Sequence, residues 1–337
     1  MEISVDKAYK CKGLTCVKLT AGRYFAVISP LTGSSVLRLC DTENNIEVFR
    51  YSEDCTLEQY NSAREIWGLP TLYLPNRFDA GVVKTSDGEY QLPVNEKMFG
   101  NHIHGWAHKR EHKLESAEVK GAGAVCVTSY TFDESDEMFA CFPLRFKLTY
   151  TYELSEDEGL KQTVKLENLS DRQLPVSICT HTCISSPIKV GGSEEGLLLA
   201  VPVEEKCELN DRCLPTEKLL PLNDYDKSYK EGTMKPVLHD ISNDMYTAAM
   251  GELDGKPFYG AVVTDTESGL RVCNEVSEEY RFWNMWNDRG FNGYFCPEPM
   301  TAMINACNLS LDREVSGYTE LARGEAFECR QRFFTIA

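Results

Sequence analysis

The segment "GNHIHGWAHKREH", residues 100–112, holds four of the six histidines in the chain. His102 and His104 are separated by one residue, while His104, His108 and His112 recur at every fourth position. On an α-helix this spacing would place three imidazoles on one face, and such a set can bind Zn²⁺. Whether the segment does this chemistry depends on whether it is helical.

The neighbouring residues argue against a metal site in this segment. Gly105 and Trp106 interrupt the helical register, because a glycine inside a helix costs roughly 1 kcal/mol. On an extended segment His102 and His104 point to the same side, and the other two histidines lie well away. No cysteine or acidic residue completes a zinc set at a regular spacing. We therefore predict no bound metal, one functional histidine and three histidines at the surface.

Strands are the elements that must position any functional residue here. The stretch "FPLRFKLTYTYEL" (142–154) alternates apolar and polar residues without a break. The turn residues "SEDEG" follow, and "LKQTVKLEN" (160–168) alternates again. A period of two is typical of a half-buried β-strand, so the two stretches predict a hairpin.

Similar short strands recur along the chain and define the expected fold. The runs "YFAVIS", "IEVFRY", "AVCVTSYTF", "FYGAVVT" and "ECRQRFFTI" favour strands, and "TLEQYNSAREIWG" is the best helix candidate, with Thr56 as N-cap and Gln59 three residues on. Strands without alternating helices predict an all-β fold, a large antiparallel β-sandwich. No linker is evident, so we expect one domain over residues 1–337. The proline-bearing stretch 211–233 is expected to cross the surface as a long excursion.

Composition limits the class of protein and its partners. The 337 residues are 42% hydrophobic and 26% charged, and no 20-residue apolar run predicts a transmembrane helix or a membrane partner. A net charge of −17 argues against nucleic acid. The N-terminus has no apolar signal region. The fourteen cysteines lie largely in strand-like runs with no CxxC motif, which favours reduced, buried thiols in a cytoplasmic protein.

Six segments occur in an order that is known from one family. They are "GLPTLYLPNRFDAG", "GEYQLPVN", "HIHGWA", "KLENLSDRQLPVSICTHTCI", "SNDMYTA" and "NGYFCPEPMTAMINACN". Together they resemble the aldose 1-epimerase (galactose mutarotase-like) family over roughly residues 20–335. Each motif alone is weakly specific, and their order makes the resemblance stronger. The family's fold is the large antiparallel β-sandwich already expected from the strands.

The resemblance implies mutarotation, the interconversion of the α and β anomers of a free aldohexose. A base takes the proton of the anomeric hydroxyl, and an acid protonates the ring oxygen; no metal, nucleotide or redox cofactor is required. The motifs assign the base to Glu298 and the acid to His181. Pro297 and Pro299 flank Glu298 and restrict the backbone around it, which aims the carboxylate.

The same resemblance assigns residues that would bind the sugar. His104 is expected to hydrogen-bond near the ring oxygen, and Arg77 and Asp244 to bind hydroxyls. Alternatively, Arg77 and Asp244 form a structural ion pair, and Asp240 is a rival for the acidic role. Further candidates for substrate binding are Asn76 and, for stacking on a sugar face, Trp106, Trp283 and Trp286, although aromatic residues in a sandwich are more often core.

One departure from the family pattern leaves the substrate open. Relatives usually have an aromatic residue soon after the catalytic histidine, whereas this chain has "HTCISS" after position 180. A hexose-6-phosphate mutarotase is an alternative, because Lys109 and Arg110 follow "HGWAH", although His108 stands where such relatives have arginine. A non-catalytic carbohydrate-binding protein and an isomerase or lyase for a modified sugar are further alternatives. The expected partner is a small sugar, and the expected state is a monomer or a homodimer.

Overall fold

Antiparallel strands dominate the computed structural model, which describes residues 2–337. The first sheet holds, in order, β1 (Ile3–Cys11), β2 (Leu14–Ala21), β3 (Tyr24–Ser29), β4 (Ser35–Asp41) and β5 (Ile46–Glu47). The second holds β11 (Lys113–Lys120), β12 (Gly123–Phe132), β13 (Phe146–Ser155), β14 (Gly159–Asn168), β29 (Ala326–Ile336), β25 (Arg271–Val276), β24 (Gly260–Asp265) and β18 (Leu197–Ala200). The third holds β20 (Pro215–Pro221), β19 (Val203–Leu209), β21 (Ser242–Ala248), β26 (Phe282–Trp286), β27 (Tyr294–Met300), β16 (Cys179–Thr180) and β6 (Thr71–Leu72), with β17 (Ile184–Ser185) also paired to β27.

Smaller elements fill the ends of the molecule. The two-stranded pairs are β7 (Arg77–Asp79) with β10 (Asn101–Ile103), β8 (Val82–Thr85) with β9 (Gly88–Gln91), β15 (Leu174–Val176) with β28 (Thr319–Leu321), and β22 (Gly251–Leu253) with β23 (Lys256–Phe258). The α-helices are α1 (Leu57–Ser62), α2 (Asp224–Glu231) and α3 (Arg313–Ser316). Within residues 2–337 no helix has the length and apolar character needed to cross a bilayer.

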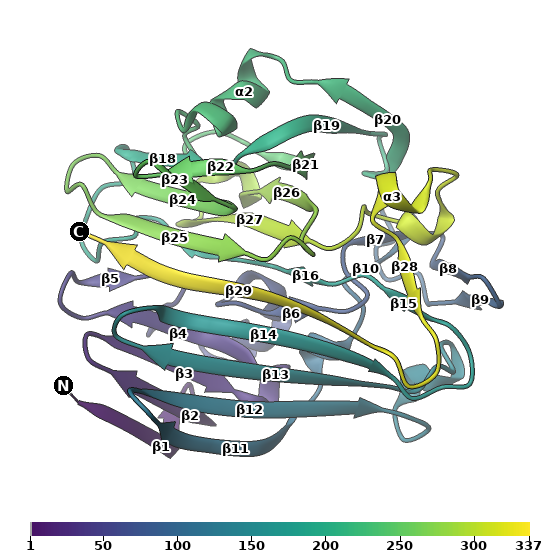
Figure 1. Cartoon of the computed structure of the whole chain (residues 1–337), viewed down its shortest axis with the longest axis horizontal. Helices are drawn as coiled ribbons and strands as arrows, with labels where there is room; N and C mark the ends of the chain where they lie inside the picture. The colour runs from purple at the N-terminus through teal and green to yellow at the C-terminus, as the bar shows by residue number, and fades with distance from the viewer. Residues whose placement is uncertain (1) are drawn as a thin grey trace.

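The second sheet faces both of the others, and this stacking confirms the predicted β-sandwich. In Figure 1 its long strands β11–β14 and β29 run in front of the purple N-terminal sheet. The Tyr24 hydroxyl of the first sheet lies 2.7 Å from the Thr335 hydroxyl on β29. Gln162 on β14 donates to the Thr71 hydroxyl of the third sheet at 3.1 Å. One hydrophobic cluster extends through all three sheets, from Val17 to Phe333.

The hairpin predicted from alternation is confirmed. Strands β13 and β14 pair from Phe146↔Asn168 to Ser155↔Gly159. The apolar face of β13 is buried, and the residues between are half-buried or exposed. Gly159 has φ 71°, and a Cβ there would lie 2.1 Å from the Phe333 carbonyl oxygen. The turn therefore requires glycine at that position.

The helix candidate is confirmed as the short helix α1. Thr56 accepts from the Gln59 backbone N–H, and the Gln59 side chain accepts from the Thr56 N–H. This reciprocal pair is the capping box that the spacing predicted. The helix ends at Ser62, earlier than the candidate segment does.

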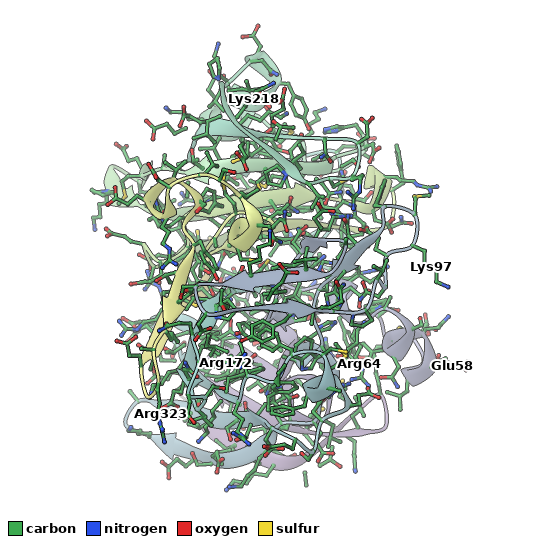
Figure 2. The ribbon with its side chains drawn as sticks, turned by 90° about the vertical axis from the view of Figure 1, so that its right-hand side faces the viewer. Glu58, Arg64, Lys97, Arg172, Lys218 and Arg323 are labelled. Carbon is green, nitrogen blue, oxygen red and sulfur yellow. The ribbon has the colours of Figure 1, made fainter. Side chains whose placement is uncertain are left out.

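The expected surface excursion over 211–233 is partly wrong, because much of it is regular structure. Strand β20 extends the third sheet at its edge, and its Lys218 lies at one extreme of the molecule (Figure 2). Helix α2 follows, with Asn223 as N-cap and Gly232 as C-cap in the left-handed region. Tyr229 on α2 is fully buried. These capping residues are the start and stop signals of a helix, and they were present in the sequence.

The expectation of surface histidines is also wrong. His102, His108 and His112 are each buried. The His102 ring hydrogen-bonds the Pro93 carbonyl oxygen at 2.8 Å, and the His112 ring stacks on Tyr130. The segment is a strand followed by a single 3₁₀ turn, so these histidines fill the core between sheets.

The prediction of free, mostly buried thiols is confirmed. Each of the fourteen cysteines is free, and eleven of them are buried. Buried cysteines behave as small apolar side chains, which fits their positions in apolar strands.

Candidate functional site

A cavity of about 250 Å³ lies where strands of the third sheet meet the β7–β10 pair. Its lining comes from seven separate segments between positions 65 and 298. The lining residues are Glu65, Ile66, Asn76, Arg77, Ile103, His104, His181, Asn243, Trp286 and Glu298. The predicted residues Glu298, His181, His104, Arg77, Asn76 and Trp286 are thus brought together around one hollow.

Glu298 is held rigidly on the wall of this cavity. It lies on β27, whose residues are all buried, and it faces Asn284 across the pairing with β26. The Asn284 amide donates to Glu298 Oε1 at 3.3 Å. The Cys179 thiol lies 3.6 Å from Oε2. The pairing with β26 and the flanking prolines leave this carboxylate little freedom to turn away.

His181 faces the same carboxylate from the next strand. Its backbone N–H donates to the Pro70 carbonyl oxygen at 2.9 Å just beyond β16. Its Nε2 lies 3.6 Å from Glu298 Oε1. Its Nδ1 lies 3.5 Å from the Cys183 sulfur. The imidazole therefore stands between a carboxylate on the cavity side and a thiol on the interior side.

Burial and mutual charge set the protonation of this pair. Burial by itself lowers the pKa of His181, but the negative charge of Glu298 and the contact with Cys183 outweigh it and raise that pKa to about 9. Burial raises the pKa of Glu298 above its ordinary value, and the nearby His181 charge and the Asn284 amide offset part of the shift. The charge on each member of the pair thus favours the opposite charge on the other.

His104 stands beside the pair in a strained backbone. His104 and Asn76 have φ of 68° and 51°, a region that non-glycine residues rarely adopt. The His104 N–H donates to the Asn76 carbonyl oxygen at 2.9 Å, which ties the two segments together. At Gly105 a Cβ would lie 2.5 Å from the Tyr73 carbonyl oxygen, so glycine must follow this histidine.

The His104 imidazole is neutral and free to hydrogen-bond a ligand. Its ring centroid lies 5.5 Å from that of His181. Burial lowers its pKa well below the ordinary value, and the positive charge of His181 acts in the same direction. Its Nδ1 is buried without a hydrogen-bond partner. An unpaired buried nitrogen is costly unless a bound polar group satisfies it.

Arg77 lines the cavity but pairs with a residue that the motifs did not indicate. Its guanidinium binds the Glu96 carboxylate, with 2.8 Å between Nη2 and Oε1. Its Nη1 donates to Asn243 Oδ1 at 3.3 Å. The alternative of an Arg77–Asp244 ion pair is therefore wrong.

Asp244 lies outside the cavity lining. Its carboxylate binds the Lys206 ammonium at 3.1 Å and accepts from the Tyr225 hydroxyl at 3.0 Å. Asp240, the rival acidic residue, is exposed and is likewise absent from the lining. The structure places Asn243 at the cavity instead.

A bulge in β21 explains why Asn243, and not its neighbour Asp244, lines the cavity. The pairing of β21 with β26 shifts register between Ser242 and Asp244, and Asn243 has φ 59°. An extra residue in one strand re-aims its side chain relative to the regular alternation. Asparagine adopts the left-handed region more readily than most residues, so its type suits this position.

The tryptophans divide between cavity and core. Trp286 lines the cavity, and its ring centroid lies 5.8 Å from that of His181. Trp106 is buried, with its ring 5.1 Å from that of Phe132. Trp283 is buried in the main hydrophobic cluster. Trp286 is thus a cavity residue, whereas the other two are core residues.

Glu65 is a cavity residue that sequence reasoning missed. It lies in a 3₁₀ turn directly before the Gly68–Pro70 motif, in a stretch interpreted as a helix. Its Oε2 has no hydrogen-bond partner and lies 3.9 Å from Nε2 of the buried His108. Its position next to a family motif was the available signal.

Three soft donors at the back of the cavity form the one group among residues 2–337 that could hold a metal ion. The ligand atoms of His181, Cys183 and Cys296 lie within 4.8 Å of one another, and all three residues are buried. Nitrogen and sulfur ligands of this kind suit Zn²⁺.

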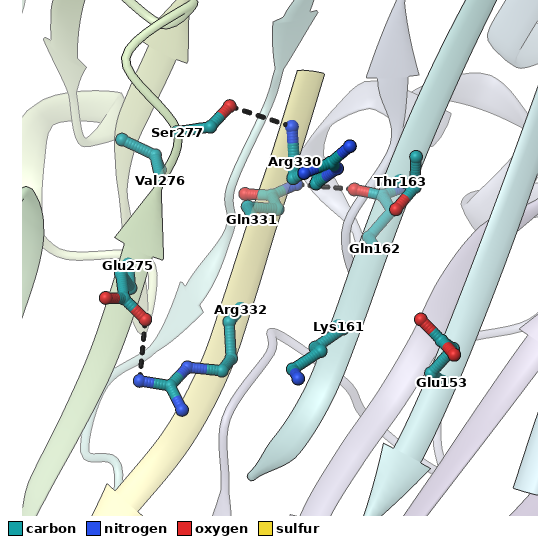
Figure 3. A pocket seen from close by; sticks show the side chains of 10 residues that line it. All are labelled: Glu153, Lys161, Gln162, Thr163, Glu275, Val276, Ser277, Arg330, Gln331 and Arg332. Carbon is teal, nitrogen blue, oxygen red and sulfur yellow. Dashed lines mark hydrogen bonds and ion pairs between the residues drawn. The ribbon is translucent and has the colours of Figure 1, made fainter. Parts of the chain in front are cut away.

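A larger hollow lies elsewhere. It measures about 680 Å³ and opens on β14, β29 and β25 of the second sheet (Figure 3). Most of its charged residues form ion pairs: Arg332 Nη2 lies 2.6 Å from Glu275 Oε2, Arg330 binds Glu328, and Lys161 binds Glu158. It has no facing imidazole and carboxylate, so its chemistry is that of an ordinary sheet surface.

The fold and the smaller cavity define a galactose mutarotase-like β-sandwich protein. The Aldose 1-epimerase family model matches residues 15–333, and the chain belongs to that family. A galactose mutarotase-like protein from Clostridium acetobutylicum is 29% identical, with a TM-score of 0.95 over 99% of this chain and 98% of the other. A galactose 1-epimerase from Lactobacillus acidophilus is 15% identical, with a TM-score of 0.71 over 99% and 98% of the two chains. A putative aldose 1-epimerase from Escherichia coli is 13% identical, with a TM-score of 0.72 over 99% of each chain; these last two likenesses are of fold.

Proposed function

We propose that this protein is an aldose 1-epimerase that interconverts the α and β anomers of a free aldohexose. The observation that supports this most is the 3.6 Å separation of His181 Nε2 and Glu298 Oε1 in a shared cavity. The anomeric hydroxyl oxygen and the ring oxygen of a hexose are bonded to the same carbon. A base and an acid that act on these two oxygens must therefore be close neighbours.

In the proposed reaction Glu298 accepts the proton of the anomeric hydroxyl. His181, protonated at Nε2, donates its proton to the ring oxygen, and the bond between that oxygen and the anomeric carbon breaks. The open-chain aldehyde rotates about its C1–C2 bond. Ring closure on the other face returns one proton to His181 and takes one from Glu298. Each placed acid or base contributes typically about 10²–10⁴-fold to the rate.

The remaining cavity residues hold the sugar during this cycle. In this proposal neutral His104 hydrogen-bonds near the ring oxygen, and Arg77 and Asn243 bind hydroxyls; their positions in the cavity lining support these roles. Trp286 offers an aromatic face. The strained backbone of His104 and Asn76 is consistent with a site that is organised before the ligand arrives.

Charge pairing in the site favours a free sugar over the alternative, a hexose 6-phosphate. Arg77 is already bound by Glu96, and Arg110 by Asp136 at 2.6 Å. Lys109 is absent from the cavity lining, and Lys97 projects outward at the edge of the molecule (Figure 2). A phosphate group would need uncommitted cations in this place.

Anomer exchange on a panel of sugars tests the proposal. Fresh α-D-glucose and α-D-galactose are followed by polarimetry, and exchange between anomers by NMR, with hexose 6-phosphates in parallel. We expect acceleration with a free hexose and little with its 6-phosphate. Sugar binding without exchange would support the non-catalytic alternative, and exchange confined to phosphorylated sugars would support the 6-phosphate alternative.

We further propose that the protein works in a reducing, cytoplasmic setting. The fourteen free thiols support this, because unpaired cysteines persist where disulfides are kept reduced.

A further inference from the structure

The "HTCISS" departure places a cysteine directly opposite a second cysteine. Strand β17 pairs with β27 as Ile184↔Phe295 and Ser185↔Tyr294, and the same register carried back one residue sets Cys183 opposite Cys296. The two sulfurs lie 3.6 Å apart. Both residues are buried in a small cluster with Tyr294.

This position in the ladder is suitable for a cross-strand bond. The Ser186 N–H donates to the Gly293 carbonyl oxygen at 2.9 Å, so Ser186 and Gly293 form a hydrogen-bonded pair. Hydrogen-bonded and non-hydrogen-bonded pairs alternate along an antiparallel ladder, and Cys183↔Cys296, three positions away, is therefore a non-hydrogen-bonded pair. The N–H and C=O of Cys183 bond to Gly68 and Arg50 instead. Cα atoms of such pairs lie about 4.5 Å apart, within the span that a disulfide bridges.

The thiol pair also touches the proposed acid. The Cys183 sulfur lies 3.5 Å from His181 Nδ1, opposite the nitrogen that faces Glu298. His181 lines the cavity, so Cys183 is the sulfur in contact with the cavity wall and the one that reacts first. As for any cysteine, the reactive form is the thiolate.

We propose that Cys183 and Cys296 are an oxidation site, at which a hydroperoxide forms a disulfide that lowers the activity of the cavity. The Cys183 thiolate attacks the peroxide O–O bond, forming a sulfenic acid and releasing an alcohol, or water from hydrogen peroxide. The Cys296 sulfur then attacks the sulfenic sulfur, a second water leaves, and the S–S bond forms. Two thiols lose two electrons and two protons, and one peroxide is reduced. A dithiol reverses the reaction by exchange.

The side chains between the cavity and the two sulfurs explain how a peroxide reaches the thiols and how the disulfide affects activity. Ile66, Trp286 and His181 line the cavity, and Ile66 and Trp286 also pack on the thiol cluster. A small peroxide in the cavity is thus separated from the sulfurs by one layer of side chains. An S–S bond is about 2.0 Å long, so closing the 3.6 Å gap between the sulfurs moves the Cys183 sulfur from its place against His181 Nδ1. The protonated imidazole then loses a hydrogen-bond partner, and the acid step slows.

The oxidation of the whole protein by hydrogen peroxide tests the inference. The chelator EDTA is present, so that a metal held by the same three donors makes no contribution. Peptide mapping is expected to show a Cys183–Cys296 disulfide with the loss of two hydrogens. Because the activity readout depends on the proposed function, anomer exchange is measured in parallel, and it is expected to fall about tenfold and return with dithiothreitol.

Two alanine variants provide the comparison. Cys296→Ala is expected to keep the activity of the reduced protein and to lose the dithiothreitol-reversible inhibition. Cys126→Ala removes another fully buried thiol on β12 and is expected to behave like the unchanged protein. Saturation with sugar is expected to slow formation of the disulfide, since the cavity is the route of entry.

Failure of this inference and failure of the proposed function give different results. If the reduced protein exchanges anomers but no disulfide joins Cys183 and Cys296, the inference is wrong and the function stands. If inhibition persists in Cys296→Ala, the inference is also wrong. If the disulfide forms but the reduced protein shows no exchange, the oxidation site stands and the proposed function is wrong.

Discussion

Two hollows of this molecule differ in a way that separates a site from a surface. The larger, about 680 Å³, opens on the face of the second sheet, and its lining includes both acidic and basic side chains. Most of these charges form ion pairs at the sheet surface, such as that of Arg332 with Glu275. The smaller, about 250 Å³, contains a buried carboxylate and imidazole that face each other at 3.6 Å.

The difference lies in which polar atoms have no hydrogen-bond partner. Among the residues that line the larger hollow, the one such buried atom is the Nε of Arg332, whose guanidinium already binds Glu275. In the smaller cavity His104 Nδ1 and Glu65 Oε2 are buried without hydrogen-bond partners, and the backbone is strained at His104 and Asn76. Unpaired buried polar groups and strain cost stability, so a fold that keeps both in one place favours a ligand there. Volume alone would have selected the wrong hollow.

The sharpest test of the comparison replaces one glutamate in each hollow by glutamine. Glu298→Gln keeps the shape of the side chain but removes the base, and we expect the rate of anomer exchange to fall about 10³-fold. Glu275→Gln, in the larger hollow, breaks an exposed ion pair and is expected to leave the rate unchanged. Polarimetry gives the rates, and calorimetric titration with sugar verifies that Glu298→Gln still binds. Equal rates of anomer exchange for the two variants would show that the smaller cavity is not the active site.

A second pair of substitutions replaces one basic residue in each hollow. His181→Asn removes the proposed acid, and we expect about a 10²-fold loss of rate with sugar binding retained. Lys161→Gln changes a charged residue that lines the larger hollow, and no loss is expected. A wild-type rate in His181→Asn would show that another group protonates the ring oxygen.

Much of the fold was predictable because its signals are local. The alternation of 142–154 determines which side of β13 is buried, whatever the partner strand is. The capping box of Thr56 and Gln59 is likewise a relation between residues three apart. The positions of Glu298 and His181 could be suggested from motif order, although their distance depends on the pairing of β16 with β27.

The features that sequence reasoning missed depend on partners distant in the chain. The left-handed conformation of Asn243 arises from a bulge against β26, so nothing local showed that Asn243 rather than Asp244 lines the cavity. The histidines at 102, 108 and 112 seemed to be surface residues because their burial comes from packing between sheets. Glu96 was not identified, since its pairing with Arg77 joins strand β7 to the connection between β9 and β10.

The pH dependence of kcat/KM tests the charge coupling between His181 and Glu298 in the smaller cavity. With the pKa of His181 raised to about 9, kcat/KM is expected to fall as pH rises through about 9, because the acid loses its proton. The acid limb is expected above the ordinary glutamate range, because burial raises the pKa of Glu298 and a protonated base is inactive.

The variant Glu298→Gln separates the effect of the Glu298 charge on the pKa of His181 from the effect of burial. In Glu298→Gln the negative charge is gone while the burial of His181 remains, so the pKa of the imidazole is expected to fall. NMR titration of His181 measures it directly, and Glu275→Gln supplies the control in which it stays at its wild-type value. If the pKa of His181 is the same in both variants, the carboxylate of Glu298 is not what raises it.

The smallest expected effect concerns two adjacent residues on opposite sides of the cavity boundary. Asn243→Ala removes an acceptor for Arg77 and a group that lines the cavity, and we expect KM for the sugar to rise about fivefold with kcat little changed, as for the loss of one hydrogen bond. Asp244→Asn alters a carboxylate held by Lys206 and Tyr225 outside the lining, so its KM is expected to stay within about twofold of wild type. The reverse order of effects would mean that β21 presents Asp244 to the sugar without its bulge. Because the two positions are neighbours, only the bulge distinguishes them, and steady-state kinetics on the pair therefore tests the backbone conformation as well as the site.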